Sequence, residues 1–517
     1  MMNRAITWCA RHSAGTLLVL FLIAVLTRIP SLAIPVIDTD EAMYANAARG
    51  LLRGLTLYRD VVDSKPPLIF PVYALLLAVV NDLRFVHLAT IIVVWGTAVA
   101  LARTVARSFD EKSGVVAGIL YLIFVACIGQ SSNAEIFMNL PIVLGAYCGL
   151  AAPPSQRRAA WLAAAGFLIG VASLIKQQAI VAIVPIAVVA IIPRIRAHRL
   201  WLVAEWASLA CGMLLPYALT AWYFHSAGTL AEAVHWAYRH NLQYVQRGPT
   251  AGFAGNLARS LLIAVVISNL ILWWYAFRSF FALRNSAIDT RERVALFFGA
   301  LWLIVSCFAV TMGGRYYTHY FLQLTPVLVF LAAPPLTKKL MRFAELPSWQ
   351  RTALSFMILA PLIGHTAFFS IKAGRGNYGC QHPDIVAASA FAALHTSPEE
   401  RIFVWGSPIP AYLANRQDAY RAVNRAFAFE NRDPCHMAKA PIDADTLART
   451  PSFDLMMGDL AREKPSMLLD ASPTNIQCWG SLPLEKFEPL RRFVHEGYVI
   501  KETIGNVRIY ERGAPRP

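Results

Sequence analysis

Residues 91–102 read IIVVWGTAVALA, and this stretch decides the class of fold. Residues 15–25 and 180–192 are equally apolar, and such stretches are too apolar to face water. Of the 517 residues, 57% are hydrophobic and 15% are charged, against about 25% charged in soluble proteins. This composition excludes a soluble globular enzyme and a disordered chain. It predicts a polytopic α-helical membrane protein.

Apolar runs of this kind recur through most of the chain. A spanning helix needs roughly 20 predominantly apolar residues. About eleven runs have spanning length: 14–34, 86–106, 114–130, 135–152, 159–175, 177–193, 200–224, 259–283, 293–312, 318–335 and 352–372. A further run, 66–80, is too short to be counted with them.

Basic connectors between the runs indicate whether residues 66–80 cross the membrane. If this run does not cross, every basic connector shares one side with Arg4 and Arg11, as the positive-inside rule requires. These connectors are 103–112, 157–158, 194–199, 278–293 and 338–351. We therefore predict a juxtamembrane or re-entrant helix at 66–80. The loop at 35–66, the turns at 130–135, 174–178 and 313–319, the loop at 225–258 and the tail then lie on the outer side.

The net charge of +16 does not indicate nucleic-acid binding. Many of the basic residues lie in short connectors, and no compact basic stripe interleaved with aromatic residues occurs. The charge is that of a multi-pass protein of a plasma membrane, and we expect the bilayer, not nucleic acid, as its surroundings.

The tail changes in composition. We predict a catalytic transmembrane domain at 1–372, with juxtamembrane helices in the first outer loop at 36–82, and a soluble extracytoplasmic α/β domain at 373–517. Strand-like runs in the tail lie at 401–405, 467–469 and 508–511. If the tail is extracytoplasmic, two of its three cysteines can pair, and the sequence does not say which of Cys380, Cys435 and Cys478 these are.

The first outer loop, residues 37–68, reads IDTDEAMYANAARGLLRGLTLYRDVVDSKPPL. Asp40 and Glu41 follow the first span, where acidic side chains are costly unless they are solvated or used. One interpretation is a solvated loop that caps a helix beginning near Ala42, with Asp40 as the N-cap. The other is a carboxylate that takes a proton from an acceptor hydroxyl. Lys65 either pairs with a phosphate at the membrane surface or only extends to the interface.

The motifs of this loop resemble a known family. Asp40-Glu41 with Tyr44, then Tyr58-x-Asp60 and Asp63-Ser64-Lys65-Pro66-Pro67, are similar to the first loop of C-type glycosyltransferases (GT-C). The relatives are the protein O-mannosyltransferases and the bacterial aminoarabinose transferase of lipid A. The resemblance follows the order of spans and outer turns and is weak in the tail.

This resemblance implies transfer of a sugar from a polyprenyl-phosphate carrier to an acceptor outside the cytoplasm, with inversion. The general base of the family then falls on Asp40, with Glu41 beside it, and its donor-phosphate lysine falls on Lys65. The aminoarabinose enzymes have a glutamate, a metal ligand, where this chain has Ser64. No cofactor is therefore certain, and a divalent metal remains open.

Two further outer turns carry charged residues. Asn133 and Glu135 begin a span, and one interpretation is ordinary helix capping, with Asn133 as the N-cap and Glu135 in the first turn. By the resemblance, Glu135 is instead a second active-site carboxylate. An alternative alignment places that family position nearer Asn139. Lys176 lies between two apolar runs on the outer side, against the charge rule. By the resemblance it contacts the carrier or the sugar, and otherwise it only extends to the interface.

The turn GGRYYTHYFLQLTP contains Arg315, with His319 four residues later on one face of a helix start. Both are candidate phosphate ligands, because a guanidinium donates two hydrogen bonds to a phosphodiester. The neighbouring tyrosines are equally consistent with an aromatic belt. In the large outer loop, His235, Tyr238 and His240 form either an acceptor surface or a lid. A metal site at His235 and His240 is the less favoured alternative, because the two are loosely spaced.

Together with this resemblance, the sequence predicts an integral-membrane glycosyltransferase of the GT-C type. Its partners would be a polyprenyl-phosphate-linked sugar and an acceptor that is a glycolipid such as lipopolysaccharide, a polysaccharide or a protein of the cell envelope. We expect it in the bacterial inner membrane, with the active site extracytoplasmic. The alternatives are a lipid or sugar transporter or flippase, and a non-catalytic envelope receptor. Unexpected charges cluster at one surface, whereas transporters place them near the midplane.

Overall fold

The computed structural model describes residues 2–513 except 154, 156, 192–198, 243–252, 284–288, 313, 376–381 and 440. The chain forms two compact units, each described here by itself. The membrane unit comprises Met1–Ala33, His87–His225 and Phe253–Ser370, and the loop–tail unit comprises Ile34–Val86, Ser226–Gly252 and Ile371–Pro517. The first outer loop thus groups with the tail. The predicted division at residue 373 stays a prediction.

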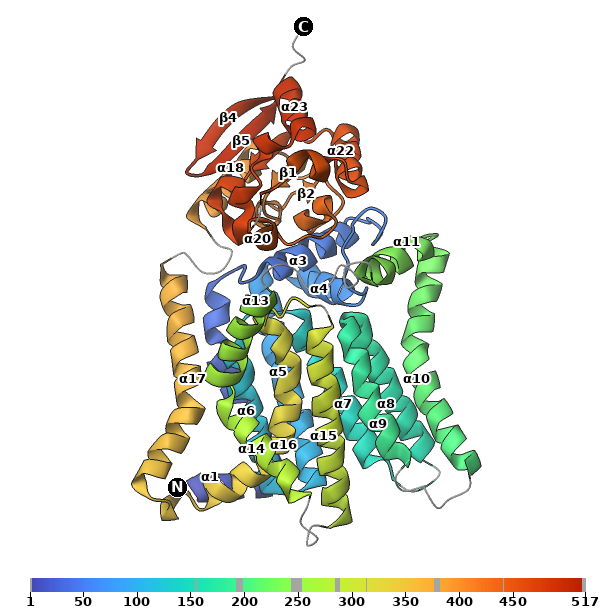
Figure 1. Cartoon of the computed structure of the whole chain (residues 1–517), viewed down its shortest axis with the longest axis vertical. Coiled ribbons are helices and arrows are strands. Elements are labelled where there is room, and N and C mark those ends of the chain that lie inside the picture. The colour runs from blue at the N-terminus through green and yellow to red at the C-terminus, as the bar shows by residue number, and fades with distance from the viewer. Residues whose placement is uncertain are drawn as a thin grey trace. The chain divides into compact units, whose positions relative to one another are not determined.

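The membrane unit is a bundle of long helices (Figure 1). Its elements are α1 (Met2–Arg11), α2 (Ser13–Arg28), η1 (Ile29–Ala33), α5 (Leu83–Ser108), α6 (Glu111–Ile128), α7 (Ala134–Ala151), α8 (Arg158–Ile175), η2 (Gln177–Ala182), α9 (Ile183–Ile191), α10 (Arg199–Ser226), α13 (Phe253–Ser260), η5 (Leu261–Ile267), α14 (Leu270–Ala282), α15 (Thr290–Thr311), η6 (Thr318–Leu324), α16 (Thr325–Met341), η7 (Phe343–Glu345) and α17 (Ser348–Gly374). Helices α6, α14 and α15 all pack on α16 (Figure 1).

Within the described residues, nine helices are long and apolar enough to cross a membrane. A tenth span is possible if the bent pair Leu257–Val265 and Leu270–Phe281 counts as one. The prediction of a polytopic helical membrane protein is confirmed. The count differs from about eleven because the run at 177–193 folds as the shorter helix Gln177–Ala190 and the run at 259–283 is bent by 83°.

Each of these two differences has a local cause. Helix α8 ends because Lys176 is extended, with φ −151°. In the bent pair, residues 261–267 form a π-helical turn, and Asn269 follows with a non-helical backbone. The Asn269 amide donates to the carbonyl of Ala264 at 2.7 Å, so the side chain satisfies a backbone acceptor at the bend.

Helices α8 and α10 approach each other closely through glycine. A Cβ added to Gly166 would lie 2.0 Å from the carbonyl oxygen of Leu209, and one added to Gly212 would lie 2.0 Å from that of Ala163. Small residues let helix backbones come together where lipid provides no hydrophobic drive for association. A side chain at either position would therefore separate the two helices.

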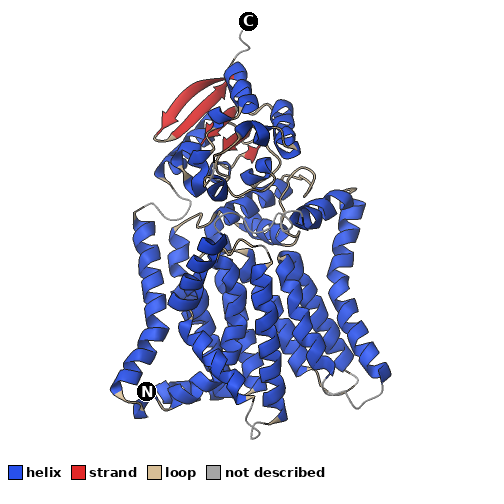
Figure 2. Cartoon of the chain, in the orientation of Figure 1, coloured by secondary structure: helices blue, strands red, loops and turns tan. Residues whose placement is uncertain are grey.

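The loop–tail unit contains a five-stranded sheet, and Figure 2 shows its strands in red. The strands are β1 (Arg401–Trp405), β2 (Gln417–Asp418), β3 (Met467–Asp470), β4 (Tyr498–Ile504) and β5 (Val507–Arg512). Their order is β2-β1-β3-β5-β4, with β1 parallel to β2 and β3, and β5 antiparallel to β3 and β4. The three predicted strand-like runs fall within β1, β3 and β5.

The described part of this unit also contains helices. They are α3 (Thr39–Leu52), α4 (Ile69–Val79), α11 (Leu230–Val234), η4 (His235–Arg239), α18 (Pro383–His395), α19 (Ile409–Leu413), η8 (Arg425–Phe429), α20 (Pro434–Met437), α21 (Ala444–Ala448), α22 (Pro451–Glu463), η9 (Ser472–Thr474), η10 (Ile476–Ser481), η11 (Leu484–Lys486) and α23 (Glu488–Gly497). Helix α4 covers most of the predicted helix at 66–80 and is too short to span a bilayer.

The first outer loop is built into the core of the tail. Val62 pairs with Ala422 in a parallel bridge and is buried among aromatic residues such as Trp405. The Asn46 amide donates to the carbonyl of Pro408 at 2.8 Å. Helix α3 is therefore held by the tail domain as well as by its own neighbours in sequence.

Arg49 adds a second attachment of α3. Its guanidinium donates to the carbonyl of Tyr412 and lies 4.1 Å from the centre of that ring. It also donates to Asn81 at 2.7 Å. Burial lowers the pKa of Arg49 to about 10, so it remains charged at neutral pH.

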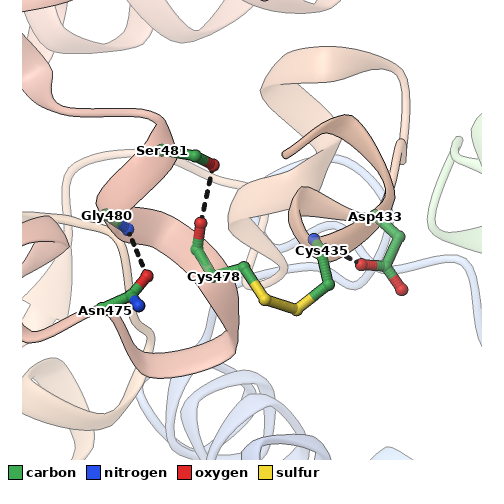
Figure 3. The surroundings of a disulfide bond; sticks show 6 residues. All are labelled: Asp433, Cys435, Asn475, Cys478, Gly480 and Ser481. Carbon is green, nitrogen blue, oxygen red and sulfur yellow. Dashed lines mark hydrogen bonds between the residues drawn. A yellow bond between two sulfur atoms is a disulfide. The ribbon is translucent and has the colours of Figure 1, made fainter. Parts of the chain in front are cut away.

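Two tail cysteines form a disulfide, Cys435–Cys478, with Cα atoms 4.9 Å apart (Figure 3). The bond joins α20 to η10. Cys380, the third candidate, lies outside the described residues. The sequence left the pairing open, and the structure settles it for these two.

Candidate functional site

The start of α3 is fixed by a capping box. Asp38 is the N-cap, and its side chain accepts a hydrogen bond from the backbone N–H of Asp40 at 2.9 Å. Glu41 returns its carboxylate to the backbone N–H of Ile37 at 2.8 Å. The sequence-based alternative with Asp40 as N-cap is thus wrong, because Asp38 takes that place. Asp40 lies in the first turn, and its carboxylate is directed elsewhere.

The Asp40 carboxylate meets two side chains of the same unit. The Tyr44 hydroxyl, one helical turn further on, donates to it at 3.2 Å. The Nζ of Lys65 lies 3.8 Å from Asp40 Oδ2 and 5.6 Å from the centre of the Tyr44 ring. We call Asp40, Tyr44 and Lys65 the loop cluster. The Asp40 and Lys65 side chains are 18% and 20% exposed, so both are shielded yet reachable.

Buried polar groups shape the backbone around Lys65. The Tyr58 hydroxyl donates to the carbonyl of Lys65 at 2.7 Å, and burial raises the pKa of Tyr58 well above its ordinary value. The backbone N–H of Lys65 donates to Asp63 at 3.0 Å. Burial raises the pKa of the Asp63 carboxyl, and the nearby Lys65 charge opposes the rise. Asn241 donates to the carbonyl of Ser64 at 2.5 Å.

A second cluster lies in the membrane unit. The Lys176 ammonium, at the break between α8 and η2, pairs with the Glu135 carboxylate at the start of α7. His319 Nε2 lies 3.8 Å from Glu135 Oε1, and Lys176 Nζ lies 4.3 Å from the centre of the Tyr320 ring. We call Glu135, Lys176, His319 and Tyr320 the bundle cluster. Glu135 and Lys176 are both buried, so neither is an exposed interfacial charge.

Two asparagines, Asn133 and Asn139, lie within four residues of Glu135 in the sequence. Asn133 is the N-cap residue of α7, but its fully buried side chain makes no capping hydrogen bond. Neither polar atom of its amide has a partner among the described residues. The Asn139 amide donates to the carbonyl of Leu322 at 3.1 Å and so ties α7 to η6. The capping interpretation therefore holds for the position of Asn133 and not for its side chain.

Arg315 and His319 do not share a helix face as predicted. Residues 315–317 are non-helical, Tyr316 has a φ of +50°, and the helical turn begins at Thr318. Arg315 is buried. The ring of His319 stacks on that of Tyr317, with centroids 5.7 Å apart. The prediction that residues 315 and 319 lie on one helix face is wrong, because the helical turn η6 begins only at Thr318.

The segment at 235–240 is aromatic. The His240 ring stacks on Phe427 at 4.9 Å, and Trp236 packs against the tail core. His235 packs edge-on to Trp236, and Tyr238 is half-buried. The described residues contain no group of three or more His, Cys, Asp or Glu side chains that could hold a metal ion. The predicted roles of these residues as acceptor surface or lid are not tested by these contacts.

Comparison with known proteins shows which families and structures this chain is similar to. A family model for dolichyl-phosphate-mannose-protein mannosyltransferases matches residues 64–226. This confirms the resemblance predicted from the first loop. No curated protein sequence matches the chain.

Solved structures give a longer match. ArnT from Cupriavidus metallidurans bound to undecaprenyl phosphate is similar over 98% of this chain and 100% of that one, with a TM-score of 0.62 and 14% identity. The archaeal oligosaccharyltransferase AglB from Archaeoglobus fulgidus, in complex with an inhibitory peptide and a dolichol-phosphate, matches 98% of this chain and 75% of its own, with a TM-score of 0.57 and 12% identity. The A. fulgidus enzyme in complex with Zn and sulfate matches 96% and 73%, with a TM-score of 0.55 and 12% identity.

These likenesses establish the fold. The chain has the GT-C fold: a polytopic helical membrane protein with a C-terminal domain built on a small sheet. The matched family model and the similar structures agree with the family resemblance that the sequence predicts.

From the sequence, no role of their own was assigned to three residues of these clusters and their surroundings. Tyr44 donates to Asp40, and the signal for it was its i+4 position on the same helix. Tyr320 contacts Lys176 through its ring, but the sequence offered it only as part of an aromatic belt. Asp63 had no signal beyond its place in the motif, because only the fold shows that it is buried.

Proposed function

We propose that this protein is an integral-membrane glycosyltransferase that moves a sugar from a polyprenyl-phosphate donor to a cell-envelope acceptor. The observation that carries the proposal is the loop cluster. The Asp40 carboxylate, in the first turn of the capped helix α3, can accept a proton. It lies 3.8 Å from the Lys65 ammonium, which can hold a phosphate. The GT-C fold supplies the context in which such a pair performs sugar transfer.

The Asp40 carboxylate takes the proton from the acceptor hydroxyl as its oxygen attacks the anomeric carbon. The bond from that carbon to the phosphate oxygen breaks, and the carrier phosphate leaves. Lys65 offsets the negative charge that develops on the leaving group. One displacement of this kind inverts the anomeric configuration. Tyr44 holds Asp40 by its hydroxyl and contributes its ring beneath Lys65.

The bundle cluster provides further donor contacts in this proposal. Lys176 and His319 are phosphate or sugar ligands, and Glu135 is the second carboxylate that orients both. Arg315, buried in the same unit, is a further phosphate ligand because its fork suits two phosphate oxygens. His235, Tyr238 and His240 are proposed for the acceptor side, where aromatic rings suit a sugar face.

Two residues of the first loop argue against a divalent metal site there. The Glu41 carboxylate accepts hydrogen bonds from two backbone N–H groups, that of Ile37 at 2.8 Å and that of Asp38 at 3.3 Å. Ser64 replaces the glutamate of the aminoarabinose enzymes. The proposed reaction therefore relies on side-chain cations for the leaving phosphate.

The location follows from charge and helix length. We take the shorter helix Gln177–Ala190 and the bent pair each as one crossing and α4 as too short to span, so that the basic connectors fall on the side of the N-terminus, which the positive-inside rule makes cytoplasmic. We place both clusters and the tail on the extracytoplasmic face of a bacterial inner membrane. A glycolipid, including lipid A, a polysaccharide and a protein all remain as acceptor classes.

The test is a transfer assay with the full chain in lipid nanodiscs. A panel of undecaprenyl-phosphate-linked sugars is incubated with cell-envelope extract, and products are identified by mass. We expect a product one sugar heavier than the acceptor. Asp40→Asn should lower the rate by on the order of 10²–10⁴-fold. Asp454→Asn, an exposed carboxylate of the same unit, is the matched control. Transfer at the wild-type rate by Asp40→Asn overturns the proposal.

A further inference from the structure

The segment Asn475–Cys478 of the tail has an unusual backbone. Asn475, Gln477 and Cys478 have φ values of +54°, +50° and +64°, in the left-handed region that side chains other than glycine disfavour. Such a cluster persists only where the surrounding structure holds it. The question is what holds this segment and what it presents.

Several contacts hold it (Figure 3). The disulfide joins Cys478 to Cys435 of α20, and the backbone N–H of Gly480 donates to the Asn475 side chain at 3.0 Å. The Ser481 hydroxyl donates to the carbonyl of Cys478 at 2.8 Å. Trp479, next in the chain, is buried in the aromatic core of the tail. The segment is thus held by a disulfide, two hydrogen bonds and the buried Trp479.

The segment presents Gln477 to helix α3. The Gln477 side-chain amide donates to the Thr39 hydroxyl at 2.5 Å. Thr39 is the first residue of α3 and directly precedes Asp40. Gln477 is itself exposed, so burial does not require it to find a partner. The contact connects the tail to the turn that carries the loop-cluster carboxylate.

We propose that Gln477 is a positioning residue for Asp40 and that the Cys435–Cys478 disulfide keeps Gln477 in place. The inference rests on the proposed function, in which Asp40 is the general base. Gln477 acts through Thr39: it fixes the first turn of α3 so that the Asp40 carboxylate keeps its place beside Lys65. Proton transfer is sensitive to such placement, since a misplacement of about 1 Å costs on the order of 10²-fold in rate.

The first experiment removes the hydrogen bond. Gln477→Ala should lower kcat by about 10- to 100-fold and leave the donor KM unchanged, with the undecaprenyl-phosphate-linked sugar that the wild type uses as the probe. Thr39→Val should give the same loss in kcat, whereas Thr39→Ser, which keeps the hydroxyl, should keep the wild-type kcat. The double variant Gln477→Ala/Thr39→Val should lose no more activity than either single variant. Gln417→Ala, whose side chain faces Arg53 at the other end of α3, is the matched control.

The second experiment opens the disulfide. A Cys435→Ser/Cys478→Ser variant should show the kcat of Gln477→Ala, and adding Gln477→Ala to it should cause no further loss. If this variant fails to fold, the wild-type protein is treated with dithiothreitol below its unfolding temperature. The reagent gives two electrons and two protons, converting the S–S bond to two thiols while it closes to its own disulfide. An unchanged kcat in the folded, reduced protein overturns the role of the bond.

Hydrogen exchange separates this inference from the proposed function. Backbone N–H groups at residues 40–43 should exchange faster in Gln477→Ala than in the wild type or in Gln417→Ala, whatever the sugar. Unchanged exchange, or a wild-type kcat in Gln477→Ala, overturns the positioning role while Asp40→Asn still abolishes transfer. If the wild type transfers no sugar from any donor, the proposed function is overturned instead. The exchange result then tests only whether Gln477 stabilises the first turn of α3.

Discussion

Lys65 Nζ lies 3.8 Å from Asp40 Oδ2, and each side chain is about one-fifth exposed. The two charges neutralise each other while remaining open to a ligand. A phosphate that binds Lys65 would draw the ammonium toward itself and leave the carboxylate to an acceptor hydroxyl. The ion pair therefore suits a site in which donor binding prepares the base.

Removing the Lys65 charge tests this arrangement. Lys65→Met should lower kcat/KM by on the order of 10²–10³-fold, because it removes a group that stabilises the leaving phosphate. Lys65→Arg should retain more of the activity, since it keeps the charge with altered geometry. Initial rates over a donor series give the result. Lys501→Met, which breaks an exposed pair with Glu511, is the control, and a wild-type kcat/KM in Lys65→Met would contradict the assignment.

The buried pair of the membrane unit is expected to behave non-additively. Glu135→Gln and Lys176→Met should each destabilise the protein by about 3–5 kcal/mol, because each leaves an uncompensated buried charge. The double variant should melt at a higher temperature than either single. Thermal unfolding in detergent measures this.

Another buried pair of the same unit separates stability from function. Arg158 and Glu205 lie 3.2 Å apart and are both buried. The double variant Arg158→Met/Glu205→Gln should retain transfer, whereas Glu135→Gln/Lys176→Met should lose it even when folded. Equal transfer by the two double variants would remove the bundle cluster from the proposed site.

The stability of the tail should depend on Asp418. Burial raises the pKa of this carboxyl to about 6, although Arg425 opposes the rise. Because the folded pKa exceeds the ordinary 3.8, the folded state holds a proton that the unfolded state loses. The resulting stabilisation is complete below about pH 4 and is lost as the pH rises through about 6. The unfolding temperature of the wild type, relative to Asp418→Asn, should thus fall between these values.

Tryptophan fluorescence can follow this transition, because Trp405 and Trp479 lie in the tail core. Asp443→Asn serves as a control of opposite sign. Hydrogen bonds from Thr446 lower the pKa of the exposed Asp443 carboxyl, so its stabilising effect is lost as the pH falls. If the difference in unfolding temperature between the wild type and Asp418→Asn does not change with pH, burial does not raise the pKa of Asp418.

Chelation tests the metal question directly. Since Glu41 is occupied by the helix cap and Ser64 has no carboxylate, we expect transfer to persist in EDTA within about twofold, too small a change in barrier to represent loss of a metal-stabilised leaving group. Protein prepared without divalent ions and then supplied with Mg²⁺, Mn²⁺ or Zn²⁺ provides the control. Activity that vanishes in EDTA and returns with one of these ions would contradict the expectation.

The sequence predicted the membrane architecture well because apolar length is a local property. It could not predict the bend near Asn269 or the shortened helix after Lys176, since both depend on backbone conformations within runs of uniform hydropathy. Nor could it show that the first loop joins the tail. Contacts such as Val62 with Ala422 join distant positions and leave no periodic signal.

At the candidate site, the sequence indicated which residues matter but not which contacts each of them makes. Asp38 and Asp40 are both acceptable N-caps, and the glutamate three residues after Asp38 was the available sign of a capping box. The pairing of Lys176 with Glu135 could not be foreseen, because the two lie on different helices. The assumed helix through Arg315 failed because residues 315–317 are non-helical.

The attachment of α3 to the tail also bears on how the protein is made. Asn46 and its acceptor Pro408 are 362 positions apart, so the ribosome releases the early partner long before the late one exists. Throughout translation the loop that carries Asp40 lacks the scaffold on which it finally rests. A truncated polypeptide that inserts correctly but stops before Pro408 would contain every charged residue of both clusters and still lack the support for α3. The support for the first loop is therefore complete only once the tail has been synthesised.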